Sequence, residues 1–354
     1  MSLLESTVKE ITPQDADARA RARTRLEQLT MPHWALGRLM DLAEELAGMT
    51  NSMKPPVGRK TVVTMAGDHG IAASGVSKYP QEVTVQMVHN FVQGGAGINA
   101  LARLVGARVV VVDMGVAGDL SDLAKEGKII SRRIGAGTRS MATGPAMSRT
   151  EAVRSVEAGI EVALELGPST DVFGTGDMGI GNTSPSAAMI AIFSGAPLAE
   201  IVGRGTGIDD DQLLHKTAMI EKALEINRPD RGDALDVLAK IGGFEIGGIA
   251  GLILGAAYLR KPVLVDGFIS TAGALVAAGV APAARDFMIA SHRSMERGHQ
   301  IALDCLAKKP LLDLDMRLGE GTGAALSMNL VEAAVRILTE VATFEEASVS
   351  KADK

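Results

Sequence analysis

The chain repeatedly places a short apolar segment before a glycine-rich turn and follows the turn with a helical pattern. Aliphatic segments at Thr61–Ala66, Arg108–Asp113 and Pro262–Asp266 predict strands. Apolar residues at helical spacing predict helices over Glu82–Val105, with a break near its central glycines, and over Thr150–Leu166. Strands that alternate with helices form a mainly parallel sheet covered by helices on both faces. We therefore expect an α/β fold.

Composition limits both the kind of core and the kind of partner. The 354 residues are 46% hydrophobic but only 3% aromatic, so the core is aliphatic and suits closely packed helix-on-sheet layers. A net charge of −6 gives no basic field for nucleic acid, and we expect no nucleic-acid partner. Cys305 is the only cysteine, which excludes an intramolecular disulfide and fits a reducing cytoplasm.

Two apolar stretches resemble membrane segments at first sight. Ile246–Leu259 is too short to span a bilayer, and Pro262–Ala284 contains Asp266 and many glycines. Parallel strands and the helices that cover them also give near-continuous apolar runs. The N-terminus is polar and lacks the apolar core of a signal peptide. We interpret both stretches as buried core and expect a cytoplasmic protein without a membrane span.

Glycine is concentrated in three segments, namely Gly174–Gly179, Val202–Gly207 and Leu318–Gly323. Glycine lets the backbone approach a ligand closely and present N–H groups to anionic oxygens. None of the three predicted turns fits the dinucleotide fingerprint, and no Walker lysine follows them. They predict a generic phosphate nest, with Lys216 about two turns into the helix that Asp209 opens. The alternative is that they are tight turns without a ligand.

Polar side chains follow the predicted strands where each strand ends, which is where open α/β sheets bind ligands. They are Asp68, His69, Asp113, Asp177, Asp266 and Glu320. Glu320 lies between two glycines, and shielding from water would raise its pKa towards that of a general base. A capping role for Glu320 is the alternative. We assign the adjacent Asp68 and His69 a supporting role, since neighbouring residues seldom point at the same atom.

Two clusters permit a metal site but favour simpler structures. Asp209–Asp211 is more typical of a helix cap, where carboxylates favour the positive end of the helix dipole. His292, Glu296 and His299 have the spacing of one helical face, as metal ligands on a helix would need. Gly298 weakens a regular helix there, so we favour a hydrogen-bonded structural cluster.

Taken together in order, the motifs resemble those of the nicotinate-nucleotide–dimethylbenzimidazole phosphoribosyltransferase (CobT) family of cobalamin synthesis. The resemblance extends from about Met31 to Val341. It rests on Ala66-Gly67-Asp68-His69-Gly70, Tyr79-Pro80, Glu82-Val83-Thr84, Gly94-Gly95-Ala96-Gly97-Ile98-Asn99, Asp113-Met114-Gly115, Met178-Gly179-Ile180-Gly181-Asn182-Thr183, Gly205-Thr206-Gly207, Val265-Asp266-Gly267-Phe268, Ser291-His292 and Leu318-Gly319-Glu320-Gly321-Thr322-Gly323.

The resemblance implies a fold, a reaction and a division into domains. The fold is a Rossmann-like catalytic domain, here residues 61–330, with a small helical domain built from residues 1–60 and 331–354. The reaction transfers the phosphoribosyl group of nicotinate mononucleotide to 5,6-dimethylbenzimidazole, releasing nicotinate and α-ribazole 5′-phosphate. The family needs neither metal nor cofactor, and its members are homodimers.

The resemblance also assigns roles to individual residues. Glu320 is the expected general base. Substrate contacts fall to ten residues, namely Tyr79, Gln86 and Leu318 for the benzimidazole base, Gly205, Gly207 and Lys216 for the phosphate, Gly179 and Asn182 close to the phosphate, Asp177 for the ribose, and Asp266 near the nicotinate and ribose.

One position departs from the family pattern. Asp177 stands where a glutamate is expected, and it is one methylene shorter. Aspartate still reaches the ribose through a shifted backbone or a water. Two alternatives therefore stay open beside the expected reaction, namely a non-catalytic nucleotide-binding relative and a family member that uses another base, such as a purine or a phenol. A dinucleotide-dependent oxidoreductase is a further alternative, which only the fold and the glycine segments favour.

Overall fold

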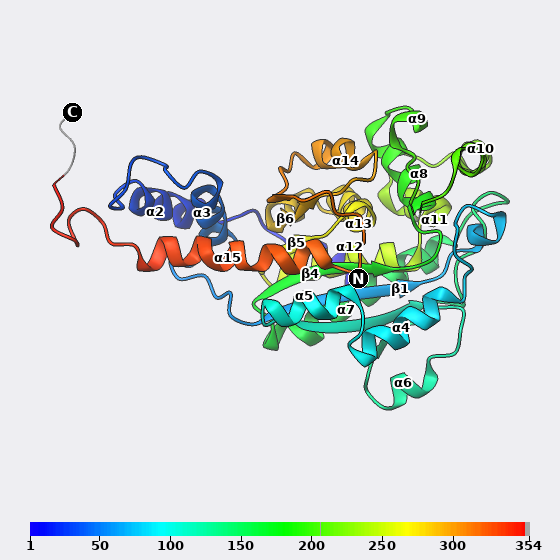
Figure 1. The fold of residues 1–354 in the computed structure, drawn as a ribbon, viewed down its shortest axis with the longest axis horizontal. Coiled ribbons are helices and arrows are strands. Elements are labelled where there is room, and N and C mark those ends of the chain that lie inside the picture. Colours follow the sequence, from blue (N-terminus) through cyan, green and yellow to red (C-terminus); the bar gives the residue numbers. More distant parts are fainter. Residues whose placement is uncertain (206, 351–354) are drawn as a thin grey trace.

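A single six-stranded sheet organises the molecule. The computed structural model describes residues 1–205 and 207–350. All neighbouring strands of the sheet are parallel, in the order β3-β2-β1-β4-β5-β6, and Figure 1 shows its central strands. The strands are β1 (Lys60–Gly67), β2 (Arg108–Gly115), β3 (Ile130–Ser131), β4 (Val172–Met178), β5 (Val263–Val265) and β6 (Met288–Ala290). This is the strand order of the Rossmann fold.

The strand order fixes where a ligand site belongs. β1 pairs with both β2 and β4, so the order in which the chain adds strands to the sheet reverses between β1 and β4. In open α/β sheets this switch point leaves a crevice at the carboxyl ends of the two strands. Met65 of β1 lies opposite Asp177 of β4, which places Asp177 at that edge.

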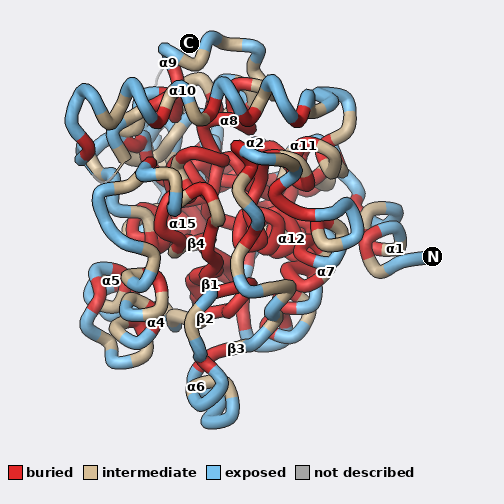
Figure 2. The backbone as a smooth tube through the Cα atoms, turned by 90° about the vertical axis from the view of Figure 1, so that its right-hand side faces the viewer, coloured by how far each residue is buried: buried red, intermediate tan, exposed pale blue. Residues whose placement is uncertain are grey.

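Helices cover both faces of the sheet, as the sequence predicts. α4 (Val83–Gln93), α5 (Gly97–Leu104) and α15 (Thr322–Glu340) pack against one face, while α12 (Phe244–Tyr258) and α13 (Phe268–Val280) pack against the other. Buried residues concentrate at the sheet and at the inner sides of these helices (Figure 2). The predicted α/β class and the break between α4 and α5 are confirmed.

Several of the other helices begin at residues that satisfy free N–H groups of their first turns. Ser148 forms a capping box with Glu151 at the start of α7, and Asp209 forms one with Gln212 at the start of α10. The cap at Asp209 follows the sequence prediction. The remaining α-helices are α1 (Leu3–Glu10), α2 (Ala16–Leu26), α3 (Arg38–Thr50), α6 (Ser121–Lys125), α7 (Arg149–Leu166), α8 (Thr183–Ser194), α9 (Leu198–Ile201), α10 (Asp210–Asn227), α11 (Ala234–Ile241) and α14 (His299–Leu306).

Segments from the two ends of the chain pack together at one end of the molecule (Figure 1). α2 and α3 pack against each other and against α15. Arg25 fastens them, because its guanidinium donates to the carbonyl oxygens of Leu338 and Val341. α1 packs on α7 and α12 instead. α15 runs without a break across residue 330, and the domain boundaries stay a prediction.

The two apolar stretches are core, as predicted. Every residue of α12 from Phe244 to Ala257 is buried, and so is α13 from Phe268 to Ala278. Among residues 1–205 and 207–350, no helix combines the length and the apolar character that crossing a bilayer requires.

One prediction about the glycine segments is wrong. The segment Gly174–Gly179 is not a turn, because β4 continues through Met178. Gly176 is required because the backbone at Glu320 lies against β4 at this position, and a Cβ at Gly176 would collide with it. The chain does not bend there. The glycines of β4 therefore let the loop before α15 lie directly on the strand.

Candidate active site

A cavity of about 480 Å³ lies at the carboxyl ends of the central strands. It holds seven of the eleven residues that the sequence singles out, namely Tyr79, Asp177, Gly179, Asn182, Gly205, Leu318 and Glu320. Its other lining residues are Val83, Met87, Met178, Ile180, Thr183, Gly267, Phe268, Ile269, His292, Ser294, Glu296, Arg317 and Gly319. Segments far apart in the sequence thus meet at the switch point of the sheet.

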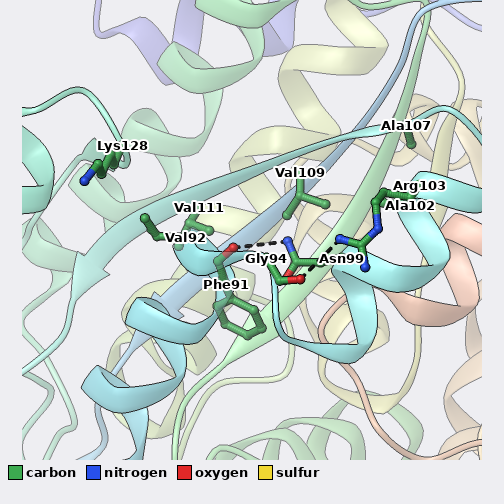
Figure 3. A pocket seen from close by; sticks show the side chains of 10 residues that line it. All are labelled: Phe91, Val92, Gly94, Asn99, Ala102, Arg103, Ala107, Val109, Val111 and Lys128. Carbon is green, nitrogen blue, oxygen red and sulfur yellow. Dashed lines mark hydrogen bonds between the residues drawn. The ribbon is translucent and has the colours of Figure 1, made fainter.

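A second cavity, of about 360 Å³, lies over β2 beside α4 and α5 (Figure 3). None of the predicted site residues lines it. Its cationic side chains already have partners, since Arg103 donates to the carbonyl oxygen of Gly94 and Lys128 pairs with Glu126. We therefore place the candidate site in the first cavity.

Glu320 enters the cavity from a strained loop. Its φ is +62°, a conformation that glutamate rarely adopts, and the flanking Gly319 and Gly321 also have positive φ. One carboxylate oxygen, Oε2, accepts the backbone N–H of Ile98 at 3.0 Å. No other donor in the described part of the chain reaches the carboxylate. Burial raises the pKa of Glu320, with a smaller contribution from Asp266.

Asp266 holds this loop in place. Its carboxylate accepts the backbone N–H groups of Gly321, Gly323 and Ala324 at 3.1, 2.7 and 3.0 Å. It therefore caps α15 and fixes the backbone that presents Glu320. Asp266 does not line the cavity, although Gly267 beside it does. Its predicted place near the nicotinate and ribose stays a prediction.

Asp177 is buried at the end of β4 beside Asn182. Its Oδ2 accepts the Asn182 side-chain N–H at 3.0 Å, while Oδ1 has no partner among the described residues. Burial, reinforced by the charge of Asp266, raises the pKa of Asp177 from 3.8 to about 8. At neutral pH the carboxyl is therefore largely protonated, and it can donate a hydrogen bond to a ligand hydroxyl.

This pKa predicts how Asp177 affects stability. Between its unfolded pKa of 3.8 and its folded pKa of about 8, the native state binds more protons than the unfolded state. The contribution of Asp177 to stability therefore falls as pH rises through that range. We expect Asp177→Asn to raise Tm by several degrees at pH 8 and to have little effect near pH 4, as measured by calorimetry. An equal change in Tm at both pH values would contradict this assignment.

The glycine segment after α9 lies beside a buried lysine. Lys216 of α10 donates through Nζ to Thr183 Oγ1 at 2.8 Å and to the carbonyl oxygen of Gly203 at 3.2 Å. Gly205 and Thr183 line the cavity, so Nζ lies just behind its wall. Burial lowers the pKa of Lys216 to about 8. Gly207, at a φ of +97°, lies outside the cavity lining.

Thr206, which the resemblance places in the phosphate segment, lies outside the described residues. Gly179 is described and lies directly after β4. A Cβ there would collide with the carbonyl oxygen of Gly67, so this glycine lets the ends of β1 and β4 come together. The phosphate-binding roles of Gly205, Gly207 and Lys216 stay predictions.

Apolar side chains line the cavity together with Glu320. Val83 and Met87 lie one turn apart on α4, and Tyr79 precedes that helix. Tyr79 and Leu318 are 51% and 59% exposed, which places apolar side chains at the cavity mouth. Gln86 is exposed on α4 and does not line the cavity, so its predicted contact with the base stays a prediction.

His292 is a cavity residue to which the sequence assigns only a structural role. It lies on β7 (His292–Arg293), is 1% exposed, and neither ring nitrogen has a hydrogen-bond partner among the described residues. His299 begins α14 and bonds to Thr271 and Ser294, as a structural residue would. Burial lowers the pKa of His299 to about 3, so it stays neutral. The two histidines do not share one helix.

Asp68 and His69 support the site from behind. His69 Nε2 lies 2.6 Å from Glu245 Oε1, and both side chains are buried. Burial acts most strongly and lowers the pKa of His69, but the charge of Glu245, the hydrogen bond to it and the charge of Asp68 together outweigh burial, and the pKa is raised. Asp68 accepts the backbone N–H of Ala117. Neither residue lines the cavity, which agrees with the supporting role expected for them.

The cavity of this Rossmann-type sheet holds a shielded carboxylate and a glycine segment, with a buried lysine behind its wall. These features suit an enzyme that acts on a phosphorylated substrate, and comparison with known proteins gives such a class. Residues 11–349 match the sequence profile of a phosphoribosyltransferase family. The chain belongs to the nicotinate-nucleotide–dimethylbenzimidazole phosphoribosyltransferase family.

Individual relatives match over nearly their whole length. The enzyme of that name from Syntrophotalea carbinolica is 64% identical over 351 residues, covering 99% of each chain. The one from Desulfotalea psychrophila is 58% identical and covers 100% of each chain. The crystal structure of CobT from Thermus thermophilus superposes with a TM-score of 0.91 at 46% identity, covering 95% of this chain and 100% of that one.

Proposed function

We propose that the protein transfers the phosphoribosyl group of nicotinate mononucleotide to 5,6-dimethylbenzimidazole, as a step in cobalamin synthesis. The observation that carries the proposal is the arrangement of the cavity. Its lining combines apolar side chains of α4 and the carboxylate of Glu320 with Gly205 and Thr183, and Lys216 lies directly behind Thr183. The apolar side chains suit a flat aromatic base, and the glycine segment with its lysine suits a phosphate.

The mononucleotide occupies the deeper part of the cavity. Its phosphate lies against Gly205 and Thr183, where Lys216 supplies positive charge. Its ribose lies at the end of β4, within reach of Asp177 and Asn182. Because Asp177 is largely protonated at neutral pH, it donates to a ribose hydroxyl instead of repelling the phosphate.

Glu320 acts on the incoming base. The unprotonated ring nitrogen of the benzimidazole attacks the ribose C1′, and the bond from C1′ to the nicotinate nitrogen breaks with its electron pair going to that nitrogen. The pyridinium ring becomes the neutral pyridine ring of nicotinate, while the benzimidazole becomes cationic and gives its N–H proton to Glu320. Attack from the opposite face converts the β-linkage to α. A carboxylate with a raised pKa, held by Ile98, suits this transfer.

The nicotinate leaves towards the part of the cavity lined by the start of α13 and by His292. Phe268 and Ile269 begin α13, and no side chain caps that helix. Their backbone N–H groups are suited to donating to a carboxylate there. His292 lies beside them without a hydrogen-bond partner among the described residues, although its Nε2 is 3.7 Å from Asp266 Oδ1.

A product assay tests the proposal directly. Purified protein incubated with nicotinate mononucleotide and 5,6-dimethylbenzimidazole is expected to release nicotinate and form a ribosyl-phosphate adduct of the base, detected by mass spectrometry. A panel with adenine and phenols ranks other acceptors. No adduct with any base, beside demonstrated mononucleotide binding and an active enzyme run in parallel, would favour a non-catalytic nucleotide-binding relative.

We also propose that the protein is a cytoplasmic homodimer. Tyr79 and Leu318 leave apolar surface exposed at the cavity mouth, and a second copy would cover such a surface. The single cysteine, Cys305, suits a reducing compartment. Sedimentation at micromolar concentration is expected to give twice the chain mass.

A further inference from the structure

A carboxylate lies at the phosphate end of the cavity, where positive charge is expected. Glu296, in the loop between β7 and α14, lines the cavity beside Gly205 and Arg317. Its Oε2 is shielded from solvent and has no hydrogen-bond partner among the described residues. The reaction proposed above makes no use of this carboxylate.

The surroundings of Glu296 are those that a phosphate would need. The backbone N–H of Gly205 donates to the carboxylate, and the charges of Lys216 and Arg317 act on it. Arg317 is itself tied to this segment, since it donates to the carbonyl oxygen of Gly205 at 3.0 Å. An N–H from a glycine segment and two cations are typical ligands of a phosphate group.

The chain approaches this carboxylate closely. A Cβ at Gly203 would lie 2.2 Å from Glu296 Oε2, so the backbone of the glycine segment lies directly against the carboxylate, which would have to shift for a larger residue. The glycine segment and an anionic group that the protein itself supplies are therefore in contact. With Lys216 and Arg317 both charged, the ionised Glu296 leaves this end of the cavity with a formal charge of +1 instead of +2.

We propose that the Glu296 carboxylate is an internal substitute for the phosphate of the ligand, and that a phosphorylated ligand competes with it for the positive charge that Lys216 and Arg317 bring to the glycine segment. This inference rests on the proposed position of the phosphate. Its chemical consequence is a weakened affinity for every phosphorylated ligand, including the product. The carboxylate thereby limits how long a phosphorylated product stays bound.

The competition depends on pH in a defined direction. Burial raises the pKa of Glu296, while Lys216 and Arg317 oppose that shift. As pH falls, Glu296 becomes protonated and loses its negative charge. The positive charge of Lys216 and Arg317 is then no longer offset, so anion binding strengthens. Lys216, with a pKa of about 8, and Arg317 both stay charged below neutral pH, and they are the cations that act on Glu296.

The experiment measures sulfate binding by calorimetry, because sulfate resembles phosphate but keeps its charge between about pH 5.5 and 7. Glu296→Gln is expected to bind sulfate about tenfold more tightly than wild type at pH 7. Wild-type affinity is expected to rise as pH falls, and to rise more steeply than that of the variant, in which only the other cavity carboxylates such as Glu320 gain protons. Glu221→Gln, the same change at an exposed position of α10, is the matched control and is expected to behave as wild type.

Glu296→Asp guards against a folding defect in the first variant. It keeps the charge but withdraws the carboxylate by one methylene, so it is expected to bind sulfate more tightly than wild type and to keep the pH dependence. Equal or weaker sulfate binding in both Glu296 variants, including no detectable binding, would overturn the inference. Failure of the proposed function gives a different result: the product assay yields no ribosyl adduct, while the sulfate measurements still come out as expected here.

Discussion

Replacing Glu320 with glutamine is expected to reduce kcat by about 10²–10⁴-fold, because the variant cannot accept the proton of the benzimidazole. Glutamine is isosteric, so the strained backbone at φ +62° and the contact with Ile98 are preserved. Binding of nicotinate mononucleotide is therefore expected to change little. Steady-state kinetics and calorimetry of mononucleotide binding measure the two effects separately.

The pH profile of the wild type supplies an independent readout for the same residue. Glu320 must be deprotonated to act, and burial raises its pKa above 4.5, so kcat/KM is expected to fall as pH drops through that raised pKa. Glu340→Gln, at the exposed last residue of α15, the helix that follows Glu320, serves as the control. Near-full activity of Glu320→Gln would reject the general-base assignment.

Lys216→Met is expected to raise the Kd for nicotinate mononucleotide by about 10–100-fold, the range for losing a hydrogen bond to a charged group. Methionine fills the volume of the buried aliphatic chain but donates nothing to Thr183 or to a phosphate. In the wild type, Lys216 loses its charge as pH rises through about 8, so affinity is expected to weaken there. The variant is expected to lose the part of this dependence that Lys216 causes and to keep only the part that comes from ionisation of Asp177, whose pKa is also about 8.

Lys222→Met provides the comparison for that experiment, since Lys222 is exposed on the same helix, α10. It removes an equal charge at the surface and is expected to leave Kd within about twofold of wild type. If Lys216→Met binds the mononucleotide as the wild type does, the phosphate does not lie at Gly205 and Thr183. Titration calorimetry below and above pH 8 measures the Kd for nicotinate mononucleotide of the wild type and of both variants.

Local patterns predict most of the fold. Alternating strands and helices, the caps at Ser148 and Asp209, and the break between α4 and α5 all follow from short-range chemistry. The extent of β4 does not, because glycines in sequence favour a turn while the approach of Glu320 to Gly176 keeps the strand extended. That approach depends on segments more than a hundred residues apart.

Some residues of the candidate site can likewise be predicted from the sequence, and others depend on the folded structure. Residues at strand ends, such as Asp177, and in glycine segments, such as Glu320, are visible in the sequence because the topology gathers them at one edge. His292 and Glu296 are visible in the sequence only as members of a candidate metal or structural cluster, since their place in the cavity depends on unpartnered atoms inside the fold. The resemblance to a family places Gln86 in the site; Gln86 is exposed on α4, and its contact with the base stays a prediction.

α15 has a mechanical consequence for the enzyme. Its 19 residues form a helix about 28 Å long. Glu320 lies just before the first residue of this helix, and Arg25 of α2 binds the carbonyl oxygens at its other end. Because a helix tilts more readily than it bends, a change at the contacts of Arg25 is expected to shift the carboxylate of Glu320, so that the ends of the chain influence the alignment of the proposed general base.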